Sequence, residues 1–473
     1  MNLSKVTHIF FFGIGGIGMS ALARYFHAAG KKVGGYDKTR STLTNQLELE
    51  GMDILFSEDP LLIPEEFKHA SKENVLVVWT PAVPASHEGL EFFRTNRFRI
   101  MKRAQLLGMI TENAKTIAIA GTHGKTTTTV LTAHLLRTAG IDCTAFLGGI
   151  SGNYNTNLLL GNSIGKTAAP AKDHLVVVEA DEYDRSFLWL YPVYAVVTAV
   201  DPDHLDIYGT KEEMHEAYKK FMAQVSGKIV TRQVLLNELG ISKGSRHITY
   251  ALDDAESDSY AENIHIADGY YFFNLIIEGK KMEQVSLGLP GRHNVENAVA
   301  AATLAAWAGA SETSIRTGLQ SFKGVERRFD VRVRSAEVIY IDDYGHHPAE
   351  LRACISSVRE LFPGKKITGI FQPHLYSRTR DFADDFARSL ELLDDVILLE
   401  IYPAREGPIP GVNAQLLLDK IRKANKTIYR KNELVERLME HDFDVLLTMG
   451  AGDIDQLVEP VEKAIRKKYK LVE

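Results

Sequence analysis

Residues 116–140 read TIAIAGTHGKTTTTVLTAHLLRTAG, and this stretch decides the fold of the chain around it. Residues 116–120 are β-branched or small and apolar, which predicts a buried strand. Apolar residues then recur at helical spacing from residue 126 to residue 139, and Gly140 ends the pattern. The glycine-rich turn of residues 121–126 lies between the two. The stretch therefore predicts a strand, a tight turn and a helix in succession.

The turn has the composition of a phosphate-binding loop. A glycine-rich turn at a helix N-terminus presents unpaired backbone N–H groups and the positive end of the helix dipole, so it holds an anion. Lys125 can then reach the β- and γ-phosphates of ATP, and the Thr126 hydroxyl can ligate Mg²⁺. The full P-loop pattern would have a glycine where this chain has Ile119. We expect ATP binding, and a plain turn with a surface lysine is the alternative.

Length and composition limit the class of protein. The 473 residues exceed one ordinary core and predict about three domains. The hydrophobic content of 45% and the charged content of 25% are typical of a soluble globular protein. The net charge of −6 gives no electrostatic footprint for nucleic acid, and no run of residues has the length of a membrane span. Only Cys143 and Cys354 are present, which excludes a disulfide framework and predicts a cytoplasmic protein.

The N-terminal segment carries a dinucleotide-binding pattern. A predicted strand at residues 8–12 is followed by GIGGIG at residues 13–18, a helix, a second strand near residues 33–36 and Asp37. This is the G-x-G-x-x-G fingerprint with an acidic residue about 20 residues further on. A nicotinamide dinucleotide would fit it, and a dehydrogenase is therefore an alternative. A UDP-sugar offers the same diphosphate and ribose.

Two further strands of the middle region end in polar residues. The apolar run 175–178 is typical of a buried parallel strand and leads into EADEYD at residues 179–184. The strand predicted at residues 195–200 leads into DPDHLD at residues 201–206. Ligands bind at the carboxyl ends of such strands, so a carboxylate and an imidazole here resemble Mg²⁺ ligands, although Mg²⁺ prefers oxygen. A pair of solvated acidic loops is the alternative.

The rest of the chain adds a hairpin, a helix and another α/β unit. We expect a β-hairpin around residues 269–277 and a long alanine-rich helix that ends near residue 308. Asn294 and Asn297 lie one turn apart on this helix, so their amides face the same way, either toward a ligand or as helix caps. Four more strands are predicted, at residues 338–342, 366–371, 396–399 and 444–448.

The whole pattern predicts three α/β domains in series. Residues 1–110 form a Rossmann-like domain, residues 111–328 a central P-loop domain with a parallel sheet, and residues 329–473 a second Rossmann-like domain.

The ordered set of motifs resembles one family over all three domains. The motifs are GIGGIGMSALA, GTHGKTTTT, EADEYDRSF, DPDHLD, GRHNVENAVAA, RRFD, DDYGHHPAE, FQPHLYSRTRDF, YPAREGPIPG and GAGDI. Together they are similar to the ATP-dependent Mur ligases of peptidoglycan synthesis. FQPHLYSRTRDF and YPAREGPIPG look more like the members that add L-alanine to UDP-N-acetylmuramate than the recycling members that attach a ready-made tripeptide to the same UDP-sugar.

The resemblance implies an acid–amino-acid ligase. The γ-phosphoryl of ATP would move to the lactyl carboxylate of UDP-N-acetylmuramate, and L-alanine would attack the resulting acyl phosphate, giving ADP, phosphate and an amide. The N-terminal domain would bind the UDP-sugar, the central domain ATP with two Mg²⁺ ions, and the C-terminal domain the amino acid. The resemblance further implies a cytoplasmic enzyme of cell wall biogenesis that is a monomer or a weak dimer, without nucleic acid or membrane insertion.

The resemblance also implies roles for individual residues. The implied catalytic residues are Lys125, Glu179, His204, Arg328 (or its neighbour Arg327) and Asp343. The implied metal ligands are Thr126, Glu179 and His204. The implied ATP-binding residues are Gly121, Thr122, His123, Gly124, Lys125, Thr126, Thr127, Asn294, Asn297 and Arg328, with Asn294 near the adenine and Asn297 more structural. The implied substrate-binding residues are Gly13, Gly15, Gly16, Ile17, Gly18, His346, His347, Arg378 and Arg380.

Three points stay open at this stage. Several Mur ligases carbamylate a lysine on the helix after the DHxD motif, where this chain has Lys219 and Lys220; a solvated basic face is the favoured reading of both. Residues 79–83 replace a serine-rich turn of the family, which leaves the sugar contacts there undefined. A degenerate ligase that senses UDP-sugars is a further alternative, but it would be expected to have lost Lys125, Glu179 or His204, and the chain keeps all three.

Overall fold

A computed structural model describes residues 3–162, 170–404, 406–423 and 425–471, leaving aside the side chains of residues 205 and 206. The chain divides into two compact units. The first comprises the chain up to Asn263 together with Phe273–Ser286 and Glu296–Phe322. The second comprises Ile264–Phe272, Leu287–Val295 and the chain from Lys323 onwards.

The first sheet of the first unit has five parallel strands in the order β3-β2-β1-β4-β5. The strands are β1 (His8–Phe12), β2 (Lys32–Tyr36), β3 (Asp53–Leu55), β4 (Val75–Trp79) and β5 (Arg99–Lys102). The helices are α1 (Ile17–Ala28), α2 (Thr42–Leu49), α3 (Glu65–His69), α4 (Glu88–Thr95) and α5 (Arg103–Glu112), with 3₁₀ turns η1 (Leu3–Lys5) and η2 (Pro60–Leu62). The strand predicted at residues 8–12 is confirmed with the same bounds.

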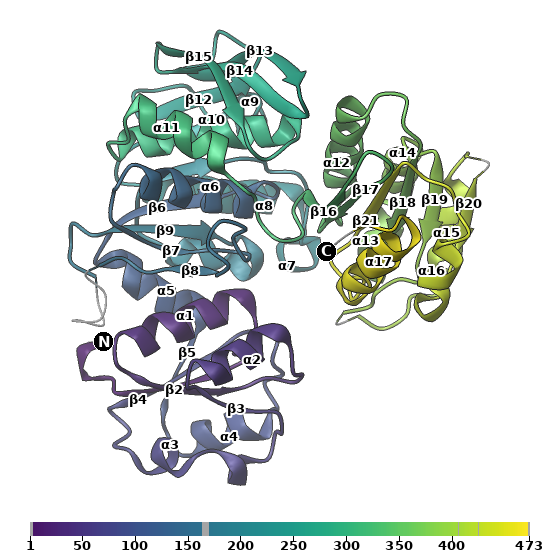
Figure 1. Cartoon of the computed structure of the whole chain (residues 1–473). Coiled ribbons are helices and arrows are strands. Elements are labelled where there is room, and N and C mark those ends of the chain that lie inside the picture. The colour runs from purple at the N-terminus through teal and green to yellow at the C-terminus, as the bar shows by residue number, and fades with distance from the viewer. Residues whose placement is uncertain (1–2, 163–169, 405, 424, 472–473) are drawn as a thin grey trace. The chain divides into compact units, whose positions relative to one another are not determined.

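Both faces of this sheet are covered because β1 is apolar on both sides. Successive side chains of a strand point to opposite faces. Phe10 and Phe12 pack in a cluster with Phe67 of α3 and Phe93 of α4. Phe11 belongs to a second cluster that includes residues of α1 and α5. Figure 1 shows the sheet between these two groups of helices.

The second sheet is built around β6 (Lys115–Ala120) and lies mostly in the first unit, although parts of β13 to β15 fall in the second. Its strand order is β15-β14-β13-β12-β11-β10-β6-β9-β7-β8. The other strands are β7 (Cys143–Phe146), β8 (Leu158–Leu159), β9 (Leu175–Ala180), β10 (Pro192–Val197), β11 (Ile229–Arg232), β12 (His247–Leu252), β13 (Ser259–Ala267), β14 (Tyr270–Ile277) and β15 (Lys280–Leu287). β6 pairs in parallel with β9 on one side and β10 on the other. The strand that leads into the predicted phosphate loop is therefore flanked by the two strands that lead into the predicted metal ligands.

The helices of this region complete its layers. They are α6 (Lys125–Thr138), α7 (Leu205–Tyr208), α8 (Lys211–Gln224), α9 (Gln233–Leu239), α10 (Arg292–Trp307) and α11 (Glu312–Ser321), with the 3₁₀ segment η3 (Tyr183–Trp189). One hydrophobic cluster runs from Ile9 and α1 of the first sheet through α5 to Ala118 and Val178 of the second. The two sheets of the first unit therefore share a core.

The appended strands differ from the expectation of one hairpin. β13 begins at Ser259, ten residues before the hairpin predicted around residues 269–277. Half-buried and exposed residues alternate along most of its length, as in a strand with one solvated face. The polar residues on the solvated face hide the strand in the sequence, and three strands form where one hairpin was predicted.

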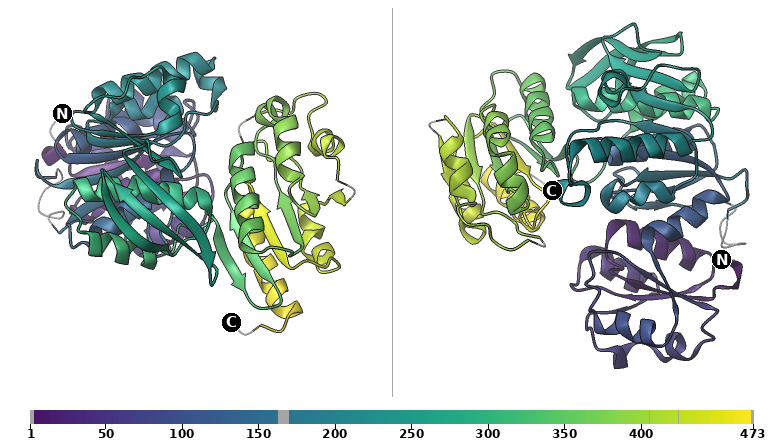
Figure 2. Two further views of the ribbon diagram at one scale, coloured as in Figure 1. Left: turned by 90° about the horizontal axis from the view of Figure 1, so that it is seen from above. Right: turned by 180° about the vertical axis from the view of Figure 1, so that it is seen from behind.

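The second unit contains a six-stranded sheet in the order β16-β17-β21-β18-β19-β20. The strands are β16 (Asp330–Arg334), β17 (Ile339–Asp343), β18 (Ile367–Phe371), β19 (Asp395–Leu398), β20 (Lys426–Ile428) and β21 (Val445–Met449). The helices are α12 (Pro348–Leu361), α13 (Tyr376–Asp381), α14 (Ala383–Leu390), α15 (Ala414–Lys420), α16 (Lys431–Leu438) and α17 (Asp455–Lys468). Four strands were predicted; β16, which is antiparallel to β17, and the short β20 were not. Figure 2 shows helices on both faces of this sheet.

The three sheets in series confirm the predicted α/β class. The predicted boundaries near residues 110 and 328 stay predictions. Among the residues that the structure describes, no helix has the length and apolar character needed to cross a membrane.

Candidate active site

The loop between β6 and α6 has the geometry of an anion cradle. Gly121 and Gly124 have φ angles of 136° and 81°, in the region that favours glycine. Gly124 is the N-cap of α6, and no side chain caps this helix. The helix begins at Lys125 and runs for 14 residues. The first-turn amides of a helix without a capping side chain can hold a phosphate.

Neighbouring segments leave room at this loop for glycine alone. A Cβ atom on Gly124 would lie 2.6 Å from Oδ1 of Asn297, and one on Gly121 would collide with the hydroxyl of Thr198. Thr122 donates its amide hydrogen to the carbonyl of Ala199 over 3.0 Å. The amide of Asp201 donates to the Thr122 hydroxyl over 3.1 Å. The segment after β10 therefore fixes the shape of the loop.

The Lys125 side chain folds back over its own loop. Its Nζ atom donates to the carbonyl of Gly121 over 2.6 Å and lies 2.9 and 2.8 Å from the two carboxylate oxygens of Glu182. Burial would lower the pKa of Lys125, but the carboxylates of Glu182, Glu179 and Asp181 outweigh it, and the pKa is raised. Lys125 is therefore charged at neutral pH.

The predicted metal ligands come from three adjacent elements. Glu179 lies in β9 opposite Ile119 of β6, near the end where the loop begins. Thr126 is buried in the first turn of α6. His204 follows β10 with a φ angle of 52°, a strained conformation for this residue that is typical of functional sites. Its Nε2 atom lies 3.8 Å from Glu182 and 3.7 Å from Asp203.

Thr126, Glu179 and His204 alone do not complete the coordination shell of Mg²⁺. In the described part of the chain, no group of three His, Cys, Asp or Glu side chains could hold a metal by itself. Mg²⁺ keeps several waters and is usually held by one or two protein carboxylates together with substrate phosphates. A hydroxyl, a carboxylate and an imidazole beside a phosphate cradle are compatible with that habit.

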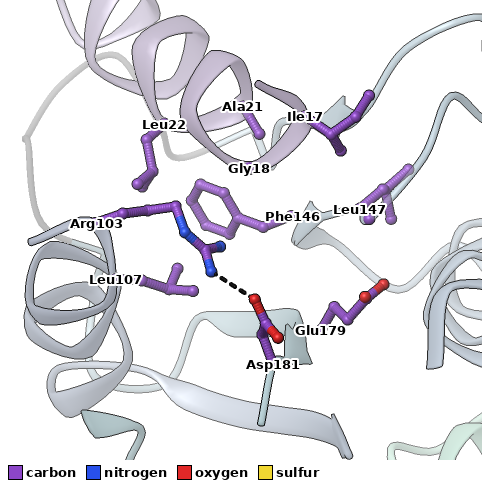
Figure 3. Close-up of a pocket in the computed structure, with 11 residues that line it drawn as sticks. Ile17, Gly18, Ala21, Leu22, Arg103, Leu107, Phe146, Leu147, Glu179 and Asp181 are labelled. Atoms are coloured by element: carbon purple, nitrogen blue, oxygen red, sulfur yellow. Dashed lines mark hydrogen bonds and ion pairs between the residues drawn. The ribbon is translucent and has the colours of Figure 1, made fainter. Parts of the chain in front are cut away.

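A cavity of about 220 Å³ opens beside Glu179. It is lined by Ile17, Gly18, Ala21, Leu22, Arg103, Leu107, Phe146, Leu147, Gly148, Glu179 and Asp181. Figure 3 shows the guanidinium of Arg103 reaching from α5 to the carboxylate of Asp181, with Glu179 beside it and α1 on the opposite wall. The cavity therefore lies between α1, which follows the predicted UDP-sugar loop, and the predicted metal ligand Glu179.

The glycine loop of the first sheet leads into this cavity. Gly16 caps α1 without a side-chain hydrogen bond, and Ile17 and Gly18 line the cavity wall. The amide of Gly15 already donates to the Asp37 carboxylate over 2.8 Å. A Cβ atom on Gly13 would lie 2.9 Å from the methyl group of Thr80, so residues 79–83 border the loop.

The two asparagines of α10 have different surroundings. Asn297 packs against Gly124 of the phosphate loop. The Asn294 side chain donates to the carbonyl of Pro290 over 2.6 Å. Asn297 packing against the loop is compatible with the structural role expected of it. The place of Asn294 near the adenine stays a prediction.

The second unit holds its own polar cluster at the end of β17. Asp343 is buried and accepts the amide hydrogens of Phe329 (2.8 Å) and Gly345 (2.7 Å). Burial raises its pKa to about 6 against the opposing charge of Arg328. Arg328 lies 3.6 Å from Glu350, whereas Arg327 donates to buried Asp342 over 2.9 Å. Arg328 is therefore the more available of the two arginines.

The predicted amino-acid residues separate into two groups. His346 and buried Arg378 surround His374, with ring centroids 5.8 Å apart for the histidines and 3.3 Å between Arg378 Nη1 and His374 Nδ1. His347 is buried as the N-cap of α12. Arg380 is exposed and donates to Asp381 over 2.7 Å. Only His346 and Arg378 thus lie in one cluster.

Lys219 and Lys220 lie at the other edge of the second sheet. The Nζ atom of Lys219 lies 2.8 Å from Glu216. Lys219 also lines a cavity with Arg246 and His247, where β12 begins. Lys220 is solvent-accessible on the same helix. Since β12, β11, β10 and β6 run parallel, the strand starts lie opposite the phosphate loop.

Comparison with known proteins identifies the family. Models of three Mur ligase regions match the chain: the Mur ligase family catalytic domain at residues 8–115, the middle domain at 119–305 and the glutamate ligase domain at 327–452. A UDP-N-acetylmuramate--L-alanine ligase from Parabacteroides distasonis is 48% identical over 472 residues, 99% of this chain and 100% of that protein. The chain belongs to the Mur ligase family.

Two further Mur ligases extend the comparison. The enzyme of the same name from Porphyromonas gingivalis strain W83 is 50% identical over 464 residues, 98% of this chain and 99% of that protein. The crystal structure of UDP-N-acetylmuramate-alanine ligase MurC from Thermotoga maritima superposes with a TM-score of 0.79 at 28% identity. It covers 98% of this chain and 99% of that one.

The geometry also adds residues to this Mur ligase site that the sequence analysis missed. Glu182 contacts Lys125, Arg103 contacts Asp181, and His374 lies between His346 and Arg378. Glu182 and His374 belong to motifs quoted above, whereas Arg103 belongs to none of them and is the first residue of α5. Glu182 and Arg103 contact partners that are distant in the sequence, so no local signal singles them out. His374 lies four residues before Arg378, and the contact becomes visible only once the segment is folded.

Proposed function

We propose that this chain is an ATP-dependent ligase that joins L-alanine to the lactyl carboxylate of UDP-N-acetylmuramate, in peptidoglycan precursor synthesis. The observation that carries the proposal is the meeting of three adjacent strand ends at one phosphate loop, with Lys125 at its centre and Glu179 and His204 at its sides. Full-length identity of 48% and 50% to proteins named for this reaction supports the choice of substrates.

The chemistry explains why such a site is needed. A carboxylate is a poor electrophile, so one of its oxygens must become a leaving group before an amine can displace it. The phosphoryl group passes from ATP to a carboxylate oxygen, and the amine then expels that oxygen as part of phosphate. Lys125 offsets the negative charge that builds up on the transferring phosphoryl group. The amides of the glycine loop hold the neighbouring phosphates.

Mg²⁺ would be held by Thr126, Glu179 and His204, and it would supply further charge neutralisation between the phosphates and the carboxylate substrate. We propose two such ions, as the family resemblance implies. The cavity beside Glu179 would admit the lactyl end of the sugar, since it connects α1 to this carboxylate. Gly13, Gly16 and Gly18 would surround the UDP diphosphate.

We propose that the second unit binds the substrate L-alanine. A buried guanidinium is suited to the carboxylate of L-alanine, and Arg378 provides one beside two histidines. Asp343 and Arg328 would serve the ATP side of the same unit. We further propose that the enzyme acts in the cytoplasm as a monomer or weak dimer.

The competing functions explain fewer residues. A nicotinamide-dependent dehydrogenase would use the first glycine loop and leave Lys125, Glu179 and His204 without a task. A catalytically inactive sensor of UDP-sugars would not need these three residues to converge. The recycling ligase shares the phosphate site, so the choice of amine alone separates it from the alanine ligase.

The test is phosphate release from ATP with Mg²⁺ and UDP-N-acetylmuramate. L-alanine, glycine, L-serine and the tripeptide L-Ala-γ-D-Glu-meso-diaminopimelate are offered in turn, and Lys125→Ala is the control. We expect turnover with L-alanine that the substitution abolishes. Turnover with the tripeptide alone would assign the recycling activity, and no turnover with any amine would favour the sensor.

A further inference from the structure

Glu182, which follows β9, places its carboxylate against the lysine of the phosphate loop. Both of its carboxylate oxygens lie within 2.9 Å of the Lys125 Nζ atom. The side chain is 1% exposed, so the ion pair is shielded from water on the carboxylate side. In the proposed function Lys125 serves the β- and γ-phosphates of ATP. The Lys125 ammonium group thus pairs with Glu182 in this structure and would pair with the phosphates of ATP in the proposed function.

The surroundings hold this carboxylate in place. The Tyr208 hydroxyl donates to the main-chain carbonyl of Glu182 over 2.6 Å. On its other side, the His204 Nε2 atom lies 3.8 Å from one carboxylate oxygen. The His204 ring also meets the Tyr183 ring edge to face, with centroids 5.2 Å apart. Glu182 therefore contacts Lys125 and His204, two residues to which the proposed function gives a role.

A buried ion pair of this kind is not explained by stability alone. Removing two charges from water costs about as much as their attraction returns, so such pairs add little net stability. Breaking one by removing a single partner leaves a buried charge and is costly. The pair therefore keeps Lys125 charged and fixes its position, and it must loosen when a phosphate arrives.

We infer that Glu182 is a positioning residue that acts through Lys125 and His204. In the nucleotide-free enzyme it holds the Lys125 ammonium over the loop, and the phosphates of ATP compete with it for that group. When they displace it, the carboxylate is left beside His204 and orients the imidazole. The inference rests on the proposed ATP-binding role of Lys125.

The inference predicts opposite effects on nucleotide affinity and on turnover. In Glu182→Gln the negative charge that competes with the phosphates is lost. The Kd for ADP without Mg²⁺ should therefore fall by at least about threefold. Lys125 and His204 lose their fixed partner, so kcat should fall by roughly tenfold to a hundredfold. Calorimetric titration with ADP and steady-state kinetics with UDP-N-acetylmuramate and L-alanine measure the two effects. A purely structural role would weaken both properties together.

Asp184→Asn is the matched control. Asp184 lies two residues further on and pairs with Lys102 over 2.7 Å, away from Lys125. It has a φ angle of 54°, which asparagine adopts readily. The control removes the same charge from the same segment, and we expect ADP affinity and kcat to change by less than about twofold.

Glu182→Asp completes the design. It keeps the charge and shortens the side chain by one methylene, so we expect a smaller loss of kcat and a smaller gain in affinity, and it carries the test if Glu182→Gln does not fold. Unchanged or weaker ADP binding in the glutamine variant, or equal effects in Asp184→Asn, would overturn the inference. Lys125→Ala separates the two claims: if it still binds ADP and turns over normally, the proposed ATP site itself is wrong.

Discussion

The guanidinium of Arg103 lies 2.9 Å from the carboxylate of Asp181. Arg103 is the first residue of α5, beside the sheet of the proposed UDP-sugar region, and Asp181 stands between Glu179 and Glu182 after β9. A Cβ atom on Gly18 would come within 2.6 Å of the same guanidinium. Arg103 thus contacts both α1, at Gly18, and the segment after β9 that follows the proposed metal ligand Glu179.

Arg103→Met should impair catalysis more than stability. The pair is partly exposed, with 22% and 36% of the two side chains accessible, so its loss should cost about 1 kcal/mol or less. The cavity wall beside Glu179 would lose its cation, and we expect kcat/KM for UDP-N-acetylmuramate to fall by roughly tenfold or more. Steady-state kinetics and thermal unfolding of the same preparation measure both.

Lys102→Met serves as the neighbouring control, since Lys102 pairs with Asp184 outside the cavity lining. It should change kcat/KM by less than about threefold. Equal kinetic losses in both variants would show that the Arg103 contact has no special role.

Gly124→Ala should abolish nucleotide binding. The new methyl group would meet the Asn297 side chain at 2.6 Å, and the φ angle of 81° strains any residue other than glycine. Gly140→Ala is the control, because its φ angle is 70° with nothing within 4 Å of a new Cβ atom. Both should lose about 1 kcal/mol of stability from backbone strain. If Gly140→Ala lost ADP binding as well, strain alone would explain the effect.

Asp343 should make the stability of the protein depend on pH. Burial raises its pKa from 3.8 to about 6, so the folded state binds the proton more tightly than the unfolded state. Its stabilising contribution is complete below pH 3.8 and is lost as the pH rises through 6. The difference corresponds to at most about 3 kcal/mol. Urea unfolding between pH 4 and pH 7 measures it.

Asp343→Asn isolates this effect, because asparagine does not titrate. The free energy of unfolding of the wild-type protein, relative to that of the variant, should fall as the pH rises from 4 to 7. A constant difference across this range would contradict the raised pKa.

Lys219 should be unmodified and dispensable. It pairs with Glu216 where β12 begins, at the edge of the sheet opposite the phosphate loop. A carbamate at this position would lie beside strand starts, whereas Glu179 lies near the end of its strand and His204 follows the end of β10. We expect Lys219→Ala to keep kcat within about twofold, as Lys220→Ala should. A large loss of kcat in Lys219→Ala, together with a rise in wild-type kcat when bicarbonate is added, would argue for carbamylation.

Much of the fold could be predicted from the sequence because its strands are strongly apolar. The strand at residues 8–12 has the predicted bounds, and the helix after the phosphate loop begins at Lys125, one residue before the prediction. β13 was missed because its solvated face is polar, and β20 because it has only three residues. Short or half-exposed strands give little periodic signal.

The site could be predicted only as far as local motifs reach. Lys125, Glu179 and His204 each follow a recognisable strand, and the structure brings their strands together. The preference for Asn294 over Asn297 could not be settled by spacing, since two residues one turn apart face the same way. Arg378 and Arg380 lie two residues apart, and only packing against His374 separates the buried one from the exposed one.

The path of a carboxylate oxygen tests the central claim most directly. UDP-N-acetylmuramate labelled with ¹⁸O in its lactyl carboxylate is incubated with the enzyme, ATP, Mg²⁺ and L-alanine, and the released phosphate is analysed by mass spectrometry. If the carboxylate is phosphorylated and then displaced by the amine, each phosphate carries one oxygen from the carboxylate. Phosphate without label, formed at the same rate as the amide, would contradict the account.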